Sequence, residues 1–222
     1  MKLTIVAATG GIGSQLLVQA VAAGHEVTAV VRNPNKLPHA PVRVVTADLS
    51  AADPAKVHQA VDGADAVLSG LGARSAAEAG VASRGTRALV EAMRATGVRR
   101  IVVVSAASVG TVPSPGRPNP PRHNPGDGFF MRHVAAPLAK AAFRQHYADL
   151  ALMEDILRDS DLDWTISRPP RLLNRRLRRS YRTAYEQNVR GGAFISRADV
   201  AHHMLDVLRR PETIRRVIGI AY

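Results

Sequence analysis

Short apolar runs alternate with longer amphipathic segments along most of the chain. The apolar runs predict strands at residues 3–6, 27–31, 42–45, 66–69, 100–104 and 164–167. The segments between them carry apolar residues with helical spacing, which predicts helices at 14–23, 54–61 and 79–96. Unbroken apolar strands that alternate with helices are typical of a doubly wound parallel sheet with helices on both faces. We therefore predict a Rossmann-like α/β fold.

The last part of the chain adds one more helix and strand. Asp199 follows Ser196 by three residues, a capping-box pattern that predicts a helix with Ser196 as its N-cap. The buried stripe of this helix would be Val200, Met204, Val207 and Leu208. Residues 216–222 predict a final strand at the edge of the sheet. A chain of 222 residues fits a single domain, residues 1–222, with a sizeable core.

The long connection after the fifth predicted strand, residues 110–146, differs from its surroundings in composition. Six prolines lie between residues 110 and 125, so this part cannot form a regular helix or strand. Phe129, Phe130 and Met131 follow, and then an Ala-rich apolar stretch, 134–143, with helical character. Long loops in compact domains are commonly functional. We interpret the segment as a lid over a ligand; the alternative is a surface excursion whose aromatic residues fill the core.

A glycine-rich turn lies between the first predicted strand and the first predicted helix. It consists of Thr9, Gly10, Gly11, Ile12 and Gly13. A tight turn of this kind lets a pyrophosphate approach bare backbone, and the following helix attracts it with unpaired N–H groups and the positive end of its dipole. The sequence therefore predicts a dinucleotide phosphate loop. The alternative is a similar turn in an unrelated α/β domain.

The residues after the second predicted strand indicate which dinucleotide would bind. An acidic residue there would accept hydrogen bonds from a ribose 2′-hydroxyl, whereas an arginine can hold a 2′-phosphate. Arg32 and Lys36 stand at this point with no acidic residue between them. NADP(H) is therefore the predicted cofactor. The alternative is that both cations are ordinary solvated surface residues.

Composition excludes several kinds of site. The chain has no cysteine, which excludes disulfides, thiolate metal sites and cysteine catalysis. His202 and His203 are adjacent on the predicted last helix, so they point about 100° apart and cannot bind one ion together. We expect no metal site.

No apolar stretch approaches the ~18 residues that span a bilayer, and no basic leader precedes the first strand, so we expect a cytoplasmic protein without a membrane partner.

Positive charge is concentrated in one segment. The net charge is +12, and residues 168–182 contain seven arginines and no acidic residue. The segment follows the sixth predicted strand, at the carboxyl edge of the sheet, where doubly wound folds bind ligands. Three interpretations remain open: a solvated face, a site for an anionic substrate, or a surface for nucleic acid or an acidic protein. Tyr181 is its one aromatic residue, which disfavours nucleic acid.

Several motifs together resemble a known family. They are, in order, Ala-x-Thr-Gly-x-x-Gly, Val-Arg-Asn-Pro-x-Lys-Leu, Ala-Asp-Leu, Gly-Leu-Gly-Ala-Arg, Asp-Trp-Thr-Ile-Ser-Arg-Pro-Pro and Ile-Ser-Arg-Ala-Asp-Val-Ala. The chain resembles the atypical short-chain dehydrogenase/reductase group. Within that group it is most similar to the NADPH-dependent biliverdin IXβ and flavin reductases and their bacterial NAD(P)H-binding relatives. The resemblance covers residues 3 to about 110 and about 147 to 222, and Ala7 stands where the family has glycine.

The resemblance implies a set of binding residues at the carboxyl edge of the sheet. The pyrophosphate would be held by Thr9, Gly10, Gly11, Ile12 and Gly13, the 2′-phosphate by Arg32 and Lys36, and the adenine by Asp48 and Leu49. Further along the cofactor, as far as its nicotinamide, would lie Gly72, Arg74, Val104, Ser105 and Pro169. The substrate would border Pro170, Arg171 and Leu172.

Ser105 is the residue that we expect to act near the nicotinamide, as a hydrogen-bond donor to cofactor or substrate. The alternative is a hydroxyl at a strand end that bonds only to backbone. Conventional short-chain carbonyl reductases share a tyrosine and a lysine four residues apart, and the lysine lowers the pKa of the tyrosine. Here Tyr147 has Ala151 at the lysine position, so this type of enzyme is not expected.

The implied activity is NADPH-dependent hydride transfer to a conjugated acceptor. A flavin, a linear tetrapyrrole or a quinone delocalises the incoming charge, so it needs less proton relay. Two other functions remain open. One is an NADP(H)-binding regulator without turnover, similar to the NmrA-like redox sensors, which also lack the tyrosine and lysine pair. The other is an atypical biosynthetic ketoreductase, isomerase or dehydratase with different acid and base groups.

Overall fold

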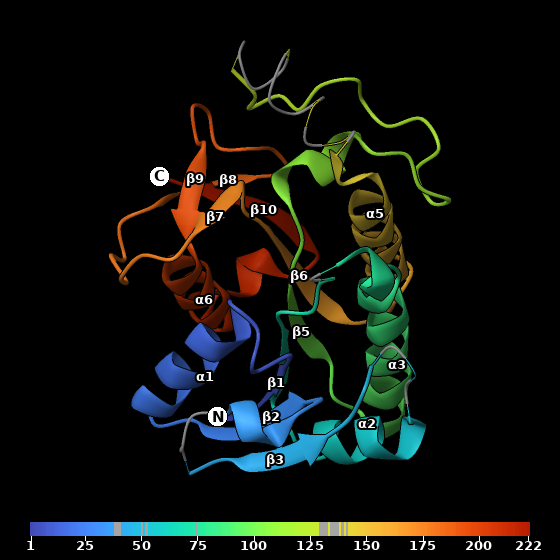
Figure 1. Ribbon diagram of the computed structural model, residues 1–222, viewed down its shortest axis with the longest axis vertical. Helices are drawn as coiled ribbons and strands as arrows, with labels where there is room; N and C mark the ends of the chain where they lie inside the picture. The colour runs from blue at the N-terminus through green and yellow to red at the C-terminus, as the bar shows by residue number, and fades with distance from the viewer. Residues whose placement is uncertain are drawn as a thin grey trace.

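The computed structural model describes residues 1–37, 41–49, 51, 53–73, 75–128, 133, 138, 140 and 142–222. In this part of the chain, eight strands form the main sheet (Figure 1). Its order is β3 (Arg43–Thr46), β2 (Glu26–Val31), β1 (Lys2–Val6), β4 (Ala66–Ser69), β5 (Arg100–Val104), β6 (Asp163–Arg168), β10 (Arg216–Ala221) and β8 (Arg182–Tyr185). Neighbouring strands are parallel except β10 and β8. The predicted Rossmann-like fold is confirmed.

Helices cover both faces of this sheet. On one face α1 (Gly13–Ala22) packs against α6 (Arg197–Asp206), and on the other α3 (Val81–Thr96) packs between α2 (Pro54–Val61) and α5 (Arg144–Arg158) (Figure 1). The strands are apolar throughout because both of their faces are covered. In β5, Ile101 and Val103 belong to the core beneath α3, whereas Val102 and Val104 belong to the core beneath α1.

Most predicted elements in the first half of the chain lie within one residue of the predicted bounds at each end. Helix α2 and strands β4 and β5 begin and end at the predicted residues. Helix α3 begins at Val81 rather than residue 79, because Gly80 before it has a left-handed backbone with φ of 84°. The predicted N-cap of α6 is confirmed, since the Ser196 side chain accepts a hydrogen bond from the Asp199 N–H at 3.0 Å.

The second half of the chain differs from the prediction in three ways. Strand β10 does not lie at the edge, because β8 pairs antiparallel with its outer side. The residues of β8 are exposed or half-buried, so this strand carries no apolar signal. A small second sheet pairs β7 (Arg171–Leu173), inside the Arg-rich segment, with β9 (Phe194–Ser196). Helix α5 was not predicted.

The chain after β5 is irregular, as predicted. A short 3₁₀ helix, η3 (Ala107–Thr111), is followed by an isolated bridge between Ser114 and Arg117. Phe129, Phe130, Met131 and most of 134–143 lie outside the described residues, so the aromatic part of the proposed lid stays a prediction. None of the helices in the described part of the chain combines the length and the apolar character needed to cross a membrane.

Candidate functional site

The turn after β1 combines a left-handed residue with a close backbone approach. Ala7 has φ of 57°, a region that glycine adopts without steric cost. The N–H of Gly10 donates to the Ala7 carbonyl at 2.7 Å and closes the turn. Gly13 packs against the same carbonyl, so closely that a Cβ there would lie 2.0 Å from the carbonyl oxygen. The turn therefore forms with alanine at position 7, and position 13 requires glycine.

This turn lies in a cleft of about 250 Å³ along the carboxyl edge of the sheet. The predicted binding residues that line it are Thr9, Gly10, Gly11, Ile12, Arg32, Asp48, Leu49, Gly72, Val104, Ser105 and Leu172. Those described but not lining it are Gly13, Lys36, Pro169, Pro170 and Arg171. Arg74 lies outside the described residues. The topology thus gathers most of the predicted set at one place, although it is scattered in sequence.

Arg32 lies at the end of β2 and has an acidic neighbour. Its Nη2 is 2.7 Å from Oε1 of Glu78, in the short helix η2 (Ala76–Glu78). The expectation that Arg32 has no acid beside it rested on its neighbours in the chain and is wrong, because β4 and η2 bring Glu78 to it. Lys36 is exposed in η1 (Pro34–Lys36). Of these two predicted cations, Arg32 faces the cleft, already paired with a carboxylate.

Ser105 directly follows β5 at the cleft, with its side chain turned toward a buried carboxylate. Its Oγ donates to Oε1 of Glu154 at 2.7 Å. The alternative that this hydroxyl bonds only to backbone is wrong. A carboxylate accepts but does not donate, so the single hydroxyl proton is engaged with Glu154. The oxygen lone pairs of Ser105 remain for a ligand in the cleft.

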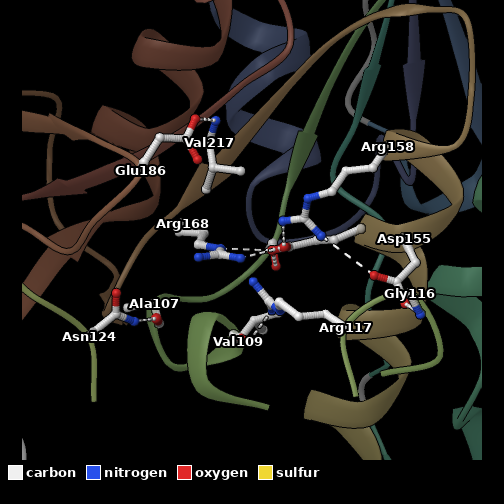
Figure 2. A network of polar contacts seen from close by, with 12 residues as sticks. Ala107, Val109, Gly116, Arg117, Asn124, Asp155, Arg158, Arg168, Glu186 and Val217 are labelled. Atoms are coloured by element: carbon white, nitrogen blue, oxygen red, sulfur yellow. Dashed lines mark hydrogen bonds and ion pairs between the residues drawn. The ribbon is translucent and has the colours of Figure 1, made fainter. Parts of the chain in front are cut away.

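Glu154 lies at the centre of a buried charge network. Nε and Nη2 of Arg168 donate to it at 2.8 and 2.5 Å, and Nη2 of Arg158 donates at 2.7 Å. Figure 2 shows Arg117, Arg158 and Arg168 turning their guanidinium groups toward the same region. Burial alone would raise the pKa of Glu154, but the charge and hydrogen bonds of Arg168, then Arg158 and Ser105, bring it below its ordinary value. Glu154 is therefore a carboxylate at neutral pH.

The network also holds the irregular segment after β5. The N–H of Gly116 donates to Oδ2 of Asp155 at 2.9 Å, and Nη2 of Arg117 donates to the Val109 carbonyl at 3.0 Å (Figure 2). Nε of Arg117 is buried and has no hydrogen-bond partner among the described residues. Burial, and then the positive charges of Arg158 and Arg168, lower the pKa of Arg117. Arg117 is thus the least well compensated cation of the network.

Helix α5 contributes two lining residues that the sequence reasoning missed. His146 and Leu150 face the cleft one helical turn apart, whereas Tyr147 packs against the core on the α3 side. Burial lowers the pKa of His146, against the opposing charge of Asp149. The helical spacing of apolar residues from Leu150 to Leu157 is the sequence pattern that indicates α5.

Arg197 is a third residue that was missed. It lines the cleft from the first turn of α6, and its side chain lies over the phosphate loop, where a Cβ on Gly11 would come within 2.7 Å of its Nε. Its Nη1 donates to Oδ1 of Asn174 at 2.7 Å. Arg197 belongs to one of the motifs that resemble the family, but its sequence position gives no sign that α6 begins beside the loop after β1.

The Arg-rich segment is anchored by its backbone. Oδ1 of Asp199 accepts from the N–H groups of Arg178 and Arg179 at 2.9 and 2.7 Å, and Leu177 between the exposed arginines is half-buried. The exposed arginines are Arg171, Arg175, Arg176, Arg178, Arg179 and Arg182. Their guanidinium groups therefore extend from a fixed backbone rather than from a free arm.

Comparison with known proteins agrees with this geometry. A family model described as NAD(P)H-binding matches residues 7–211. The uncharacterized protein YwnB of Bacillus subtilis (strain 168) is 27% identical over 226 residues, which cover 96% of this chain and 94% of that protein. The resemblance of the chain to NAD(P)H-binding proteins is confirmed by the family match.

Solved structures share the fold. ChuY of Escherichia coli O157:H7, described as an anaerobilin reductase, has a TM-score of 0.76 at 24% identity, covering 100% of this chain and 97% of that one. A wide-type short-chain dehydrogenase/reductase of Veillonella parvula DSM 2008, in complex with NADP, has a TM-score of 0.75 at 22% identity, covering 100% and 94%. The family model matches nearly the whole length of this chain. Together with the phosphate loop and the cleft, this match shows that the chain belongs to the NAD(P)H-binding family.

Proposed function

We propose that this protein is an NADPH-dependent reductase that transfers hydride to a conjugated acceptor of flavin, linear tetrapyrrole or quinone type. The observation that carries the proposal is the cleft, which joins the phosphate loop, Arg32 and Ser105 along one edge of the sheet. The similarity to ChuY, an anaerobilin reductase, and to a Veillonella protein bound to NADP supports it.

The charged residues of the cleft fit the phosphates of NADPH. The side chain of Arg197 lies against Gly11 in the phosphate loop, so it can neutralise a pyrophosphate held by the loop and the first turn of α1. Arg32 can hold the 2′-phosphate, which must compete with Glu78 for the guanidinium. Asp48 and Leu49 border the adenine side of the same cleft.

The opposite end of the cleft carries the proposed chemistry. When bound, NADPH supplies the hydride. Ser105, with its proton held by Glu154, offers lone pairs to a carboxamide or to the substrate, so its proposed role changes from donor to acceptor. Tyr147 packs against the core and does not line the cleft, so we assign it no part in proton transfer. A conjugated acceptor delocalises the charge, and water then supplies the proton.

The segments around this end remain part of the proposal. Residues 110–146 would cover the substrate, since the N–H of Gly116 ties the segment to Asp155, next to Glu154 in the network behind Ser105. Pro169, Pro170 and Arg171 would border the nicotinamide and the substrate, with Leu172 next to them in the lining of the cleft.

Titration with NADPH and NADH tests the cofactor assignment. We expect NADPH to bind more tightly by about 1.5–3 kcal/mol, the range for hydrogen bonds to a charged group. Arg32→Ala should remove the preference, whereas Glu78→Gln should strengthen it because the guanidinium no longer has a competing carboxylate. Equal affinities for both cofactors in the parent, or an unchanged preference in Arg32→Ala, would contradict the assignment.

Turnover separates the reductase from the NmrA-like regulator and from the biosynthetic alternatives. NADPH oxidation is followed by the absorbance of its reduced nicotinamide, with flavin, biliverdin and quinone acceptors in parallel. The reductase requires acceptor-dependent oxidation. Tight NADPH binding without oxidation by any acceptor would favour a regulator, and oxidation by simple ketones alone would favour a ketoreductase.

A further inference from the structure

Helix α5 presents a histidine to the cleft that the proposed function does not use. The His146 ring reaches toward the loop after β4, where a Cβ on Gly72 would lie 3.8 Å from Cε1 of the ring. Leu150, one turn later, lines the cleft from the same face of the helix. His146 therefore lies where α5 and the β4 loop meet across the cleft.

One polar atom of the ring has no partner in the described part of the chain. Nδ1 of His146 is buried and has no hydrogen-bond partner among the described residues. The neighbouring carboxylate on α5, Asp149, is engaged elsewhere, because it accepts from the N–H groups of Ala82 and Ser83 at 3.0 and 2.9 Å. Buried polar atoms are rarely left unpaired in folded proteins. A ligand in the cleft can supply the hydrogen bond.

The order of the strands indicates which part of the ligand this is. Arg32 follows β2 on one side of β1, whereas Gly72 and Ser105 follow β4 and β5 on the other side. A dinucleotide that binds across such an edge, with its pyrophosphate at the loop after β1, has its adenine half on the β2 side. Its nicotinamide half therefore lies on the side of Gly72 and His146.

The chemistry of the ring limits the choice further. Burial favours the neutral imidazole, in which one ring nitrogen donates and the other accepts. A hydroxyl group both donates and accepts, so it pairs with Nδ1 in either tautomer. Resting on the proposed function, we propose that Nδ1 of His146 hydrogen-bonds a hydroxyl of the nicotinamide ribose and so positions the reactive half of NADPH.

Dissociation constants for two ligands test this assignment without any turnover. NADPH contains both halves, whereas 2′,5′-ADP retains the adenine half and its 2′-phosphate but has no nicotinamide ribose. We expect His146→Phe to weaken NADPH about three- to tenfold, as the loss of one neutral hydrogen bond implies, and to leave 2′,5′-ADP unchanged. His146→Asn, which keeps a polar atom near the Nδ1 position, should recover part of the loss. Tyr147→Phe is the matched control and should change neither constant.

Each other outcome overturns the assignment. Equal weakening of NADPH and 2′,5′-ADP by His146→Phe would place the ring against the adenine half or show a damaged fold. No change for either ligand would show that the ring only packs. If His146→Asn bound NADPH no better than His146→Phe, the hydrogen bond would not be the cause. A parent protein that bound neither ligand would refute the proposed function itself, a result distinct from all the others.

Discussion

Ala7 has a backbone conformation that residues other than glycine rarely adopt. Its φ of 57° is imposed by the turn from β1 into α1, where its carbonyl accepts from Gly10 and contacts Gly13. A left-handed conformation costs an L-residue roughly 1–2 kcal/mol. The chain tolerates this strain at the phosphate loop because the strand before it and the helix after it are packed, which leaves the connecting residues no other conformation.

Ala7→Gly should therefore stabilise the protein. The relief of strain exceeds the extra entropy of glycine in the unfolded chain, so we expect the free energy of unfolding to rise by about 0.5–1 kcal/mol. Urea denaturation measures the change. Ala148→Gly, at an exposed position inside α5, is the matched control and should lower the same free energy by about 1 kcal/mol. Destabilisation by Ala7→Gly would contradict the inference that the backbone of Ala7 is strained.

At the scale of elements, α5 holds three separate parts of the chain through two adjacent carboxylates. Glu154 receives Ser105 from the end of β5, Arg168 from the end of β6 and Arg158 from its own helix. The next residue, Asp155, holds the backbone of Gly116. The sheet edge, the helix and the segment after β5 thus depend on the same buried pair of acids.

The arginines of this network should contribute very unequally to stability. Arg168→Met leaves the buried carboxylate of Glu154 without its bidentate partner, so we expect a loss of about 3–5 kcal/mol. Arg117→Met removes a cation that lies near two others and whose Nε has no hydrogen-bond partner within the described ranges, so we expect a loss below about 1 kcal/mol. Urea denaturation compares them. Similar losses for both variants would show that Arg117 is as well compensated as Arg168.

The whole molecule combines a net charge of +12 with buried groups that resist protonation. His203 is only 3% exposed and lies 3.2 Å, through Nδ1, from Oγ of Ser167. Burial, and then the charges of Arg210 and His202, lower the pKa of His203 to about 3. Glu154 and Asp199 also have pKa values below their ordinary range. All three groups therefore make the folded state bind fewer protons than the unfolded state in acid.

Stability should consequently fall as the pH is lowered, with His203 as the histidine whose pKa is lowered furthest. An unfolded histidine takes up its proton near pH 6.5 and the folded His203 only near pH 3, so its contribution is complete above pH 6.5 and decreases below it. Between pH 7 and pH 5 the loss from this residue is about 2 kcal/mol. Glu154 and Asp199 add further losses only below about pH 4.5.

His203→Asn tests this by the change in unfolding free energy between pH 7 and pH 5. The variant should be less stable at pH 7, but its loss on going to pH 5 should be smaller than that of the parent by about 2 kcal/mol. His58→Asn changes an exposed histidine and should lose as much stability as the parent. If His203→Asn lost as much as the parent, His203 would not be the group responsible.

The sequence by itself determined the parts that depend on local patterns. The strands at 66–69 and 100–104, the helix at 54–61 and the phosphate loop follow from apolar periodicity and glycine spacing, which act between near neighbours in the chain. The gathering of Thr9, Arg32 and Ser105 also followed, because the carboxyl ends of parallel strands meet at one edge.

Only the tertiary structure decided which distant groups meet these residues. It brought Glu78 to Arg32, Glu154 to Ser105 and Arg197 to the phosphate loop, and it placed β8 outside β10. Each of these contacts joins segments that are far apart in the chain, and their side chains follow no periodic pattern. Their positions depend on how whole helices pack on the sheet, and local propensity and spacing carry no information about such packing.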